Sequence, residues 1–188
     1  MPSSTLSTTA TAVVGGTMAC SFILLGNAIT QSFMGVPALL VDFPAPTSPS
    51  HPAAARHLGR QWPTFWSVGN VFFRPISTLG IFGYGFAAYS AYNLPFARKD
   101  WRFYAVSAVC HLVTVVHSAV NMQPLNEKLD ALSAAGGSGV KGNTKGTAGV
   151  VDASLAEWYA RRWIKLNTVR IVMPLVAGGM VLWQTLSL

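Results

Sequence analysis

The stretch Val109-Cys-His-Leu-Val-Thr-Val-Val-His-Ser-Ala-Val-Asn-Met-Gln-Pro-Leu-Asn-Glu-Lys-Leu129 predicts a membrane-spanning helix that carries His111, His117 and Asn121. At about 100° per residue, its polar side chains fall on one arc roughly 120° wide. They are His111, Thr114, His117, Ser118 and Asn121. Ionisable groups are costly in hydrocarbon and usually face the interior of a bundle, so we expect this helix to form the wall of a pocket.

The composition of the whole chain is typical of an integral membrane protein. Of its 188 residues, 51% are hydrophobic and 10% are charged, whereas soluble domains carry roughly 25% charged residues. The net charge of +7 could indicate nucleic-acid binding. The basic residues, however, stand in segments between apolar runs, where they set orientation and contact anionic headgroups. We therefore expect the lipid bilayer as a partner and no nucleic acid.

Four apolar segments predict an all-α, integral membrane four-helix bundle. We place the spans at about 10–32, 76–93, 101–122 and 166–186, in one membrane domain covering 1–188, with a flexible glycine-rich loop at 133–150. The distribution of basic residues places the two long loops in the cytosol. On the first span, Asn27 and Gln31 either bond neighbouring helices or line the pocket.

The first long loop contains a proline-rich part and an aromatic part. Four prolines between positions 42 and 52 exclude a regular helix there, and we expect His51 to be solvated. Residues 57–74 are rich in tryptophan and arginine and predict an interfacial helix or a lid. Trp66, Asn70 and Arg74 lie four residues apart and would share one face of this helix. Arg74 would anchor to headgroups or place a cation at the mouth of the pocket.

The last helix is predicted to be long, from Leu155 to Leu186, with a polar first third. Asp152 or Ser154 would be its N-cap, and Glu157 would complete a capping box with Ser154. One face of the helix would carry Tyr159, Trp163, Asn167, Arg170, Pro174 and Gly178. This face would deliver an amide and a guanidinium towards the bundle.

Three motifs in this chain resemble a known family. They are His117-x-x-x-Asn121-x-x-Pro124-Leu-Asn126-x-x-Leu129, then Trp158-Tyr-x-Arg-Arg-Trp-x-x-x-Asn-x-x-Arg170, and the segment that contains Gly69-Asn70 and Arg74. Together with four spans and a similar length, they resemble the anthrone oxygenase-type family of small membrane proteins from fungal polyketide clusters. The resemblance covers most of the chain.

The resemblance implies a monooxygenase that converts an anthrone to an anthraquinone with O₂ and needs no flavin or haem. It also implies a small apolar aromatic substrate and a place in the endoplasmic reticulum or another endomembrane. A monomer and a homo-oligomer are both compatible with the sequence.

The roles of individual residues are our hypothesis. His117 would be the base, because imidazole titrates near neutral pH. Asn121 would orient the imidazole or bind the substrate oxygen. Arg170, with Arg74 as a second candidate, would stabilise the substrate anion in a medium of low dielectric.

Several further side chains would bind the substrate. Asn126 and Asn167 would bond phenolic hydroxyls or cap chain ends, and Asn70 is a further substrate-binding candidate. Flat aromatic side chains would stack on a tricyclic substrate. They include Trp66, Tyr159 and Trp163.

Other interpretations remain open at this point. His111 and His117 would bind copper or iron only with a third ligand such as His57, because six residues do not place two ligands on one helix face. His111 alone would instead be a packed, hydrogen-bonded histidine. A membrane cyclase or isomerase of a polyketide or terpenoid would use the same base and cation. A non-enzymatic tetraspan scaffold would use the polar residues to hold its helices together.

Overall fold

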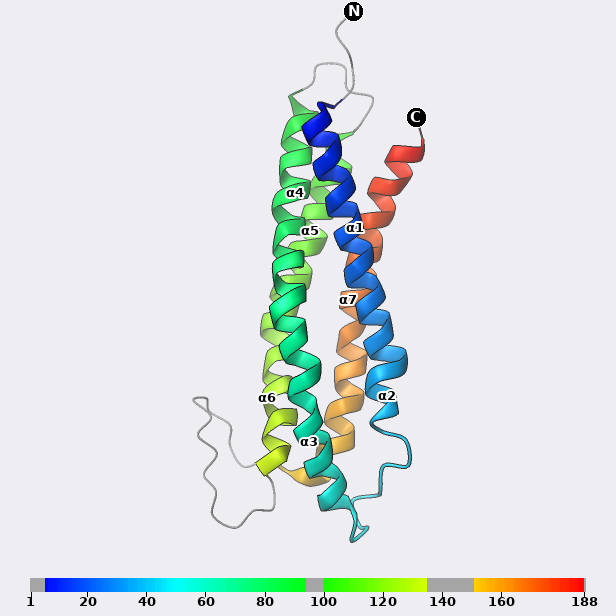
Figure 1. Ribbon diagram of the computed structural model, residues 1–188, viewed down its shortest axis with the longest axis vertical. Coiled ribbons are helices and arrows are strands. Elements are labelled where there is room, and N and C mark those ends of the chain that lie inside the picture. Colours follow the sequence, from blue (N-terminus) through cyan, green and yellow to red (C-terminus); the bar gives the residue numbers. More distant parts are fainter. Residues whose placement is uncertain (1–5, 94–99, 135–150, 188) are drawn as a thin grey trace, which may run out of the picture. The chain divides into compact units, whose positions relative to one another are not determined.

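The computed structural model describes residues 6–93, 100–134 and 151–187, and within these ranges its regular structure is helical. The longer elements are α1 (Thr8–Thr30), α3 (His51–Val68), α4 (Arg74–Tyr92), α5 (Trp101–His117), α6 (Gln123–Ala131) and α7 (Ala156–Leu186) (Figure 1). The shorter ones are α2 (Val36–Ala38) and two 3-10 turns, Leu132–Ala134 and Ala153–Leu155. The prediction of an all-α fold is confirmed.

Three π-helical turns join these helices into longer runs, at Gln31–Gly35, Gly69–Phe73 and Ser118–Met122. Each turn ends two residues before a proline, namely Pro37, Pro75 and Pro124. A proline ring collides with the carbonyl four residues earlier, and here that carbonyl belongs to the middle of the π-turn. The wider turn accommodates the ring and lets the helix continue with a local adjustment. Pro124 follows this pattern, and the helix continues after it as α6.

With these junctions, four helical runs are long and apolar enough to cross a membrane. They are Thr8–Ala38, His51–Tyr92, Trp101–Ala134 and Ala153–Leu186. The four spans placed from the sequence fall on these runs, and Asn93 lies just beyond the second. Of the predicted flexible loop, residues 135–150 lie outside the described ranges.

The first long connection is more helical than the sequence suggests. The proline-rich loop ends at Ser50, and α3 begins at His51 with Pro52 in its first turn, where the missing N–H removes no helical hydrogen bond. α3 then passes through the π-turn Gly69–Phe73 into α4. The helix expected at 57–74 is therefore continuous with the second predicted span.

The prediction that His51 is solvated is wrong. Its ring is only 3% exposed. Its Nδ1 lies 2.7 Å from the carbonyl oxygen of Pro44 and its Nε2 lies 2.9 Å from that of Ala153. The rings of His51 and Phe43 also pack edge to face. The ring thus lies between two carbonyl oxygens, one from the loop and one from the segment that begins α7, and the histidine joins these two parts of the chain.

The segment before α7 is capped by Asp152, one of the two predicted N-cap residues. Its Oδ1 accepts a hydrogen bond from the backbone N–H of Ser154 at 2.9 Å. Glu157 pairs instead with Arg161, one turn later, at 2.7 Å. The predicted capping box between Ser154 and Glu157 is thus replaced by an aspartate cap and a surface ion pair.

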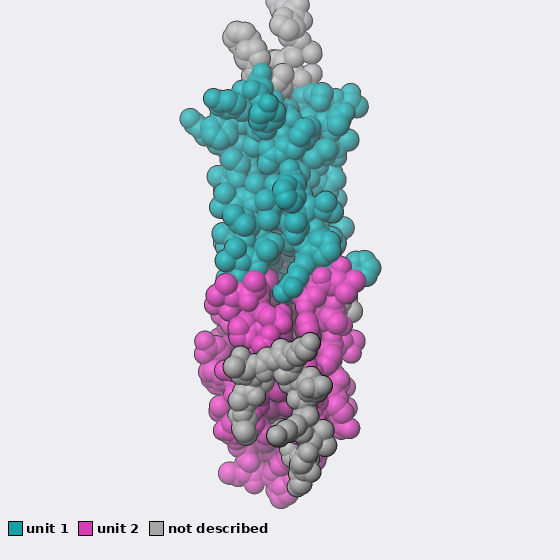
Figure 2. Space-filling model, turned by 90° about the vertical axis from the view of Figure 1, so that its left-hand side faces the viewer, with its two compact units in different colours: residues 1–28, 72–117, 169–188 teal, residues 29–71, 118–168 magenta. Residues whose placement is uncertain are grey.

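The chain divides into two compact units, which Figure 2 shows in different colours. Unit 1 comprises residues 1–28, 72–117 and 169–188, and unit 2 comprises residues 29–71 and 118–168. Each of the four helical runs contributes to both units, so no single point in the sequence separates them.

The core of unit 1 is built largely from small side chains. Its buried members are Val14, Tyr84, Ala87, Ala88, Ala91, Tyr104, Cys110, Ala177 and Val181. Small residues allow helix backbones to approach closely, which is how helices associate when lipid already solvates apolar surface. Ser107 on α5 even donates a hydrogen bond to the carbonyl of Ala177 on α7, at 3.0 Å.

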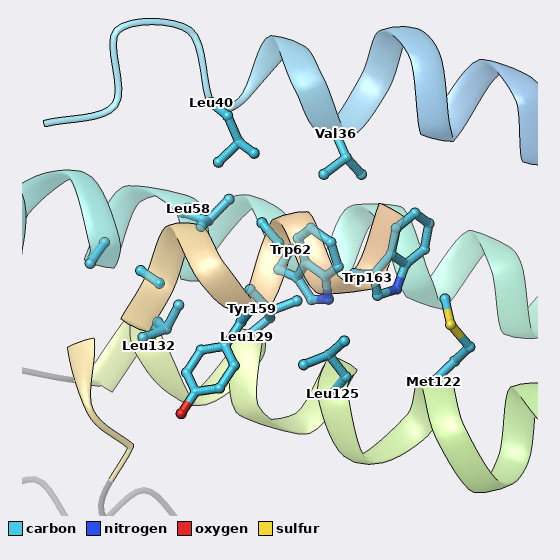
Figure 3. Packing of buried hydrophobic residues seen from close by; sticks show 13 residues of the cluster. Val36, Leu40, Leu58, Trp62, Met122, Leu125, Leu129, Leu132, Tyr159 and Trp163 are labelled. Atoms are coloured by element: carbon cyan, nitrogen blue, oxygen red, sulfur yellow. The ribbon is translucent and has the colours of Figure 1, made fainter. Parts of the chain in front are cut away.

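The core of unit 2 is built from large side chains on α2, α3, α6 and α7 (Figure 3). Its larger members are Val36, Leu40, Leu58, Trp62, Met122, Leu125, Leu129, Leu132, Tyr159 and Trp163. They recur at spacings of three and four residues along each helix, which places them on one face. The 3-10 turn Leu132–Ala134 packs tightly on α3. A Cβ at Gly59 would lie 2.9 Å from the Cβ of Leu132.

Candidate functional site

His111 belongs to a buried hydrogen-bond network in unit 1. Its ring is 1% exposed, and its Nε2 lies 2.9 Å from the hydroxyl oxygen of Ser21. That oxygen also lies 2.9 Å from the hydroxyl of Tyr84. The Tyr84 hydroxyl can donate to Ser21 while the Ser21 hydroxyl donates to the imidazole. His111 is therefore a packed, hydrogen-bonded histidine, one of the two interpretations that the sequence leaves open.

Two glycines make room for this network. A Cβ at Gly80 on α4 would collide with Nδ1 of His111. A Cβ at Gly178 on α7 would lie 3.2 Å from the Cβ of Ser21. Close helix approach at these two positions thus fixes the ring of His111 among its partners.

His117 has different surroundings from the other histidines. It is half-buried, ends α5 and directly precedes the π-turn Ser118–Met122. His111 is almost fully enclosed, His51 has both nitrogens engaged by carbonyls, and His57 is exposed. His117 is thus the histidine that combines partial burial with partial access, as a base acting on an apolar substrate requires.

Arg170 brings a positive charge into an apolar part of α7. It is half-buried and forms no ion pair with the acidic side chains, all of which lie in the described ranges. The next buried positions towards the C-terminus are Pro174, Ala177, Gly178 and Val181, so Arg170 lies on the inner stripe of its helix. An ionisable side chain within an apolar helix is a candidate for a functional site.

The register of α5 and α7 places His117 and Arg170 close in height within unit 1. The two helices run in opposite directions (Figure 1), and Ser107 is bonded to Ala177. Seven residues further along each helix, Thr114 is level with Arg170, and His117 follows one turn later, ~5.4 Å away along the axis. Side chains tilt towards the N-terminus of their helix. The guanidinium of Arg170 is therefore directed along the axis towards the level of His117.

Arg74, the other predicted cation, is exposed at the start of α4. Both interpretations of Arg74, the headgroup anchor and the cation at the mouth of a pocket, stay predictions.

Asn126 holds two indoles together in unit 2. Its Oδ1 accepts hydrogen bonds from Nε1 of Trp163 at 2.9 Å and from Nε1 of Trp62 at 3.3 Å. The two indole rings meet edge to face, with centroids 5.5 Å apart. The structure thus brings together two of the predicted substrate-binding residues, Asn126 and Trp163. The side-chain carbonyl of Asn126 already accepts hydrogen bonds from the protein itself.

Asn167 and Tyr159 also have partners in unit 2. Nδ2 of Asn167, which is fully buried, donates to the hydroxyl of Ser32 at 2.8 Å. Tyr159 is 6% exposed, and the ammonium of Lys128 lies 5.6 Å from its ring centroid. Both side chains fix α7 against its neighbours, and their roles towards a substrate stay predictions.

The other predicted residues of unit 2 differ in exposure. Trp66 and Asn70 are half-buried, whereas Asn121 is exposed on the π-turn Ser118–Met122. The roles of these three side chains towards an imidazole or a substrate stay predictions.

A metal centre finds no ready ligand set in the described part of the chain. There, no group of three or more His, Cys, Asp or Glu side chains lies close enough to hold an ion. His57, the suggested third ligand, is exposed on α3. The copper or iron alternative would therefore need donors of another kind.

Sequence reasoning missed Trp62 and Ser21 as polar partners. Trp62 lies one turn before Trp66 on the face that the sequence singles out, so the spacing of four was the available signal. Ser21 offers no comparable signal, because its role depends on Tyr84 and His111, which are distant in sequence.

A comparison with known protein families identifies a match. The family model described as anthrone oxygenase matches residues 62–180, well over half of the chain. No curated protein and no solved structure matches. The matched region begins at Trp62 and includes His117, Asn126 and Arg170.

Proposed function

This chain belongs to the anthrone oxygenase family, and we propose that it oxidises an anthrone-like tricyclic polyketide to the corresponding anthraquinone with O₂. Membership of the family supports an oxygenase-type activity. The observation that carries the specific reaction is the half-buried Arg170, which has no ion-pair partner among the carboxylates and lies about one turn from the level of His117.

The proposed reaction begins with loss of a proton from the methylene between the two aromatic rings of the anthrone. The resulting anion is electron-rich and reacts with O₂ at that carbon to give a hydroperoxide. Loss of water then leaves a carbonyl, so the carbon has exchanged two hydrogens for one oxygen atom and the second oxygen atom leaves as water. Because the anion itself reduces O₂, we propose that no cofactor is required.

His117 would accept the first methylene proton and return it to the peroxide anion to form the hydroperoxide; it would then accept the remaining proton of that carbon and pass it to the leaving hydroxide. Its half-buried ring at the end of α5 supports this role, since a base must reach the substrate while water is largely excluded. Neither His111 nor His51 offers comparable access, because both side chains are almost fully buried.

Arg170 would stabilise the anion. A fixed guanidinium in a medium of low dielectric stabilises developing negative charge far more than the same group in water. Removing one such group typically costs on the order of 100-fold to 1,000-fold in kcat. Charge at this position, rather than packing alone, would then control the rate.

The experiment compares anthrone oxidation by purified protein under air and under argon, against the spontaneous rate, with metal content recorded. Wild type should accelerate quinone formation only under air. Arg170→Gln and His117→Gln should lose roughly 100-fold in rate, with unchanged thermal unfolding. Arg102→Gln, which removes an exposed arginine at the start of α5, is the matched control and should leave the rate unchanged. Full activity in Arg170→Gln would contradict the proposal.

The alternatives differ in this assay. A cyclase or isomerase of a polyketide or terpenoid would use His117 and Arg170 equally well, but its turnover would not depend on O₂. A scaffold would show no acceleration, and its variants would lose stability instead. A metal-dependent oxygenase would contain stoichiometric metal and lose activity to a chelator.

The four apolar runs support a multi-pass membrane protein. We further propose that it resides in an endomembrane such as the endoplasmic reticulum, with the long loops in the cytosol. A membrane site suits the reaction, because the bilayer dissolves both O₂ and an apolar aromatic substrate.

A further inference from the structure

We infer that Gln31 and Trp66 form a polar subsite in unit 2 that binds the outer oxygen atoms of a flat aromatic ligand. Gln31 would accept a hydrogen bond from a ligand hydroxyl, and Trp66 would donate one to a ligand carbonyl. The class of ligand, a hydroxylated tricyclic ketone, rests on the proposed function, whereas the two polar groups are features of the structure itself.

Gln31 is a buried amide whose oxygen has no partner. The residue is 9% exposed, and its Oε1 makes no hydrogen bond to the described part of the protein. Buried polar atoms are nearly always paired, so an unpaired acceptor calls for an explanation. Gln31 is also the first residue of the π-turn Gln31–Gly35, and such turns are frequent at functional sites.

Trp66 offers a complementary donor. Its Nε1 is buried and finds no acceptor among the described residues. The two neighbouring indoles behave differently, because Trp62 and Trp163 both donate to Oδ1 of Asn126. The protein thus supplies an acceptor for these two indoles and leaves the third one unmatched.

The two unmatched groups lie at similar heights in unit 2. Gly35 is packed against Phe65, since a Cβ at Gly35 would lie 3.0 Å from its ring. Gln31 is four residues before Gly35, and Trp66 directly follows Phe65. The backbones of Gln31 and Trp66 are therefore about one helical turn apart, ~5.4 Å along the axis.

The surroundings suit a flat and mostly apolar ligand. The bond from Asn167 to Ser32, the neighbour of Gln31, brings α7 to the same level. One turn nearer the N-termini of α3 and α7, the rings of Trp62 and Trp163 meet edge to face (Figure 3). Both indoles donate to Asn126. A site with aromatic walls and a few placed polar groups is typical of small-molecule binding. A phenolic hydroxyl matches Gln31, and a ring carbonyl matches Trp66.

The test measures binding of three tricyclic probes to the full chain in detergent, by equilibrium dialysis against protein-free micelles. The first probe is a hydroxyanthraquinone whose hydroxyl points away from the carbonyl and keeps its hydrogen for the protein. The second is unsubstituted anthraquinone, and the third is anthracene, which has no oxygen. Gln31→Met preserves the length of the side chain but removes the acceptor, and Trp66→Phe removes the donor.

Each variant should lose affinity for a different set of probes. Gln31→Met should weaken binding of the hydroxyanthraquinone by about tenfold and leave anthraquinone unaffected. Trp66→Phe should weaken both quinones by about tenfold. Neither variant should alter the binding of anthracene, measured as its excess in the protein sample over protein-free micelles. Gln184→Met is the matched control, because Gln184 is a buried glutamine of unit 1, 7% exposed, that lies beside Tyr104.

Three results would overturn the subsite. They are an unchanged affinity of Gln31→Met for the hydroxyanthraquinone, an equal loss for all three probes, and the absence of saturable binding to wild type. Anthrone oxidation on the same preparations separates the two proposals. Gln31-dependent binding without oxidation would contradict the reaction but keep the subsite, whereas oxidation with Gln31-independent binding would contradict the subsite alone.

Discussion

The two units of this protein hold their helices together with side chains of different size. Unit 1 joins its helices through alanines, glycines and short polar groups, with Ser21 bonded to Tyr84 and His111. Unit 2 joins its helices through leucines and indoles, with Asn126 bonded to two tryptophans. In unit 1 the backbones approach closely, and in unit 2 large side chains fill the space between them.

This difference indicates where a ligand is accommodated more easily. Close backbone packing leaves a helix few ways to adjust, whereas contacts made by long side chains can rearrange when a side chain rotates. The unmatched pair of Gln31 and Trp66 lies in unit 2, among the large side chains. Unit 1 instead holds His117 and Arg170 on closely packed helices, which favours fixed positions for charged groups.

The largest effect is expected for Gly59→Ala in unit 2. The added Cβ would meet the backbone of Ser133 and Leu132, which cannot rotate away as a side chain could. α3 and the 3-10 turn would have to separate, at a cost of about 3 kcal/mol or more in the free energy of unfolding. Thermal unfolding in detergent measures this cost.

Gly69→Ala is the control for that variant, because a Cβ at Gly69 would meet nothing within 4 Å. Gly69 also has an α-helical φ of −56°, so alanine fits its backbone. Equal stability of Gly59→Ala and Gly69→Ala would contradict this expectation. It would show that α3 and the turn Leu132–Ala134 can separate at little cost.

A somewhat smaller effect is expected for Gly80→Ala in unit 1. The obstacle here is the imidazole of His111, a side chain that can move, but moving it breaks the bond to Ser21. We expect a loss of roughly 2–3 kcal/mol, from overpacking and from buried groups left unpaired. Gly85→Ala on the same helix is the control, because its Cβ would meet nothing within 4 Å. If Gly80→Ala lost more unfolding free energy than Gly59→Ala, the expected order of the two units would be reversed.

These two glycines also show how far the sequence could lead. Apolar segments and polar arcs predict the four helical runs, because the spacing of apolar and polar residues along the chain reflects the period of the helix and its buried face. The sequence also points to His117 and Arg170 as polar groups on inner faces. It does not reveal that Gly80 receives His111 or that Ser21 bonds to it, because these contacts join residues far apart in the chain. His51 fails for the same reason, since one of its carbonyl partners belongs to Ala153.

Removal of the central polar group compares the two networks directly. Asn126→Leu in unit 2 would leave two buried indole N–H groups without an acceptor, and we expect a loss of about 2 kcal/mol. Ser21→Ala in unit 1 would separate Tyr84 from His111, with an expected loss of about 1 kcal/mol, because interhelical hydrogen bonds between membrane helices contribute little on average.

The fluorescence of tryptophan supplies a second measurement for this pair. Asn126→Leu should shift the emission spectrum, since it changes the partners of Trp62 and Trp163, whereas Ser21→Ala should not. Equal losses of stability together with unchanged spectra would mean that the indole bonds do not distinguish unit 2.

The smallest effect is expected at the start of α7, where Asp152 caps the helix outside the apolar run. Hydrogen bonds from the side chain and the backbone of Ser154 hold the pKa of Asp152 below its ordinary value. A lowered pKa in the folded state means that the carboxylate stabilises the fold fully above its unfolded pKa of about 3.9. This contribution is lost as the pH falls through the folded value. Asp152→Asn keeps a capping side chain without the charge. The stability advantage of wild type over Asp152→Asn should therefore shrink in thermal unfolding between about pH 5 and pH 3, and a constant difference across this range would rule out the cap as its source.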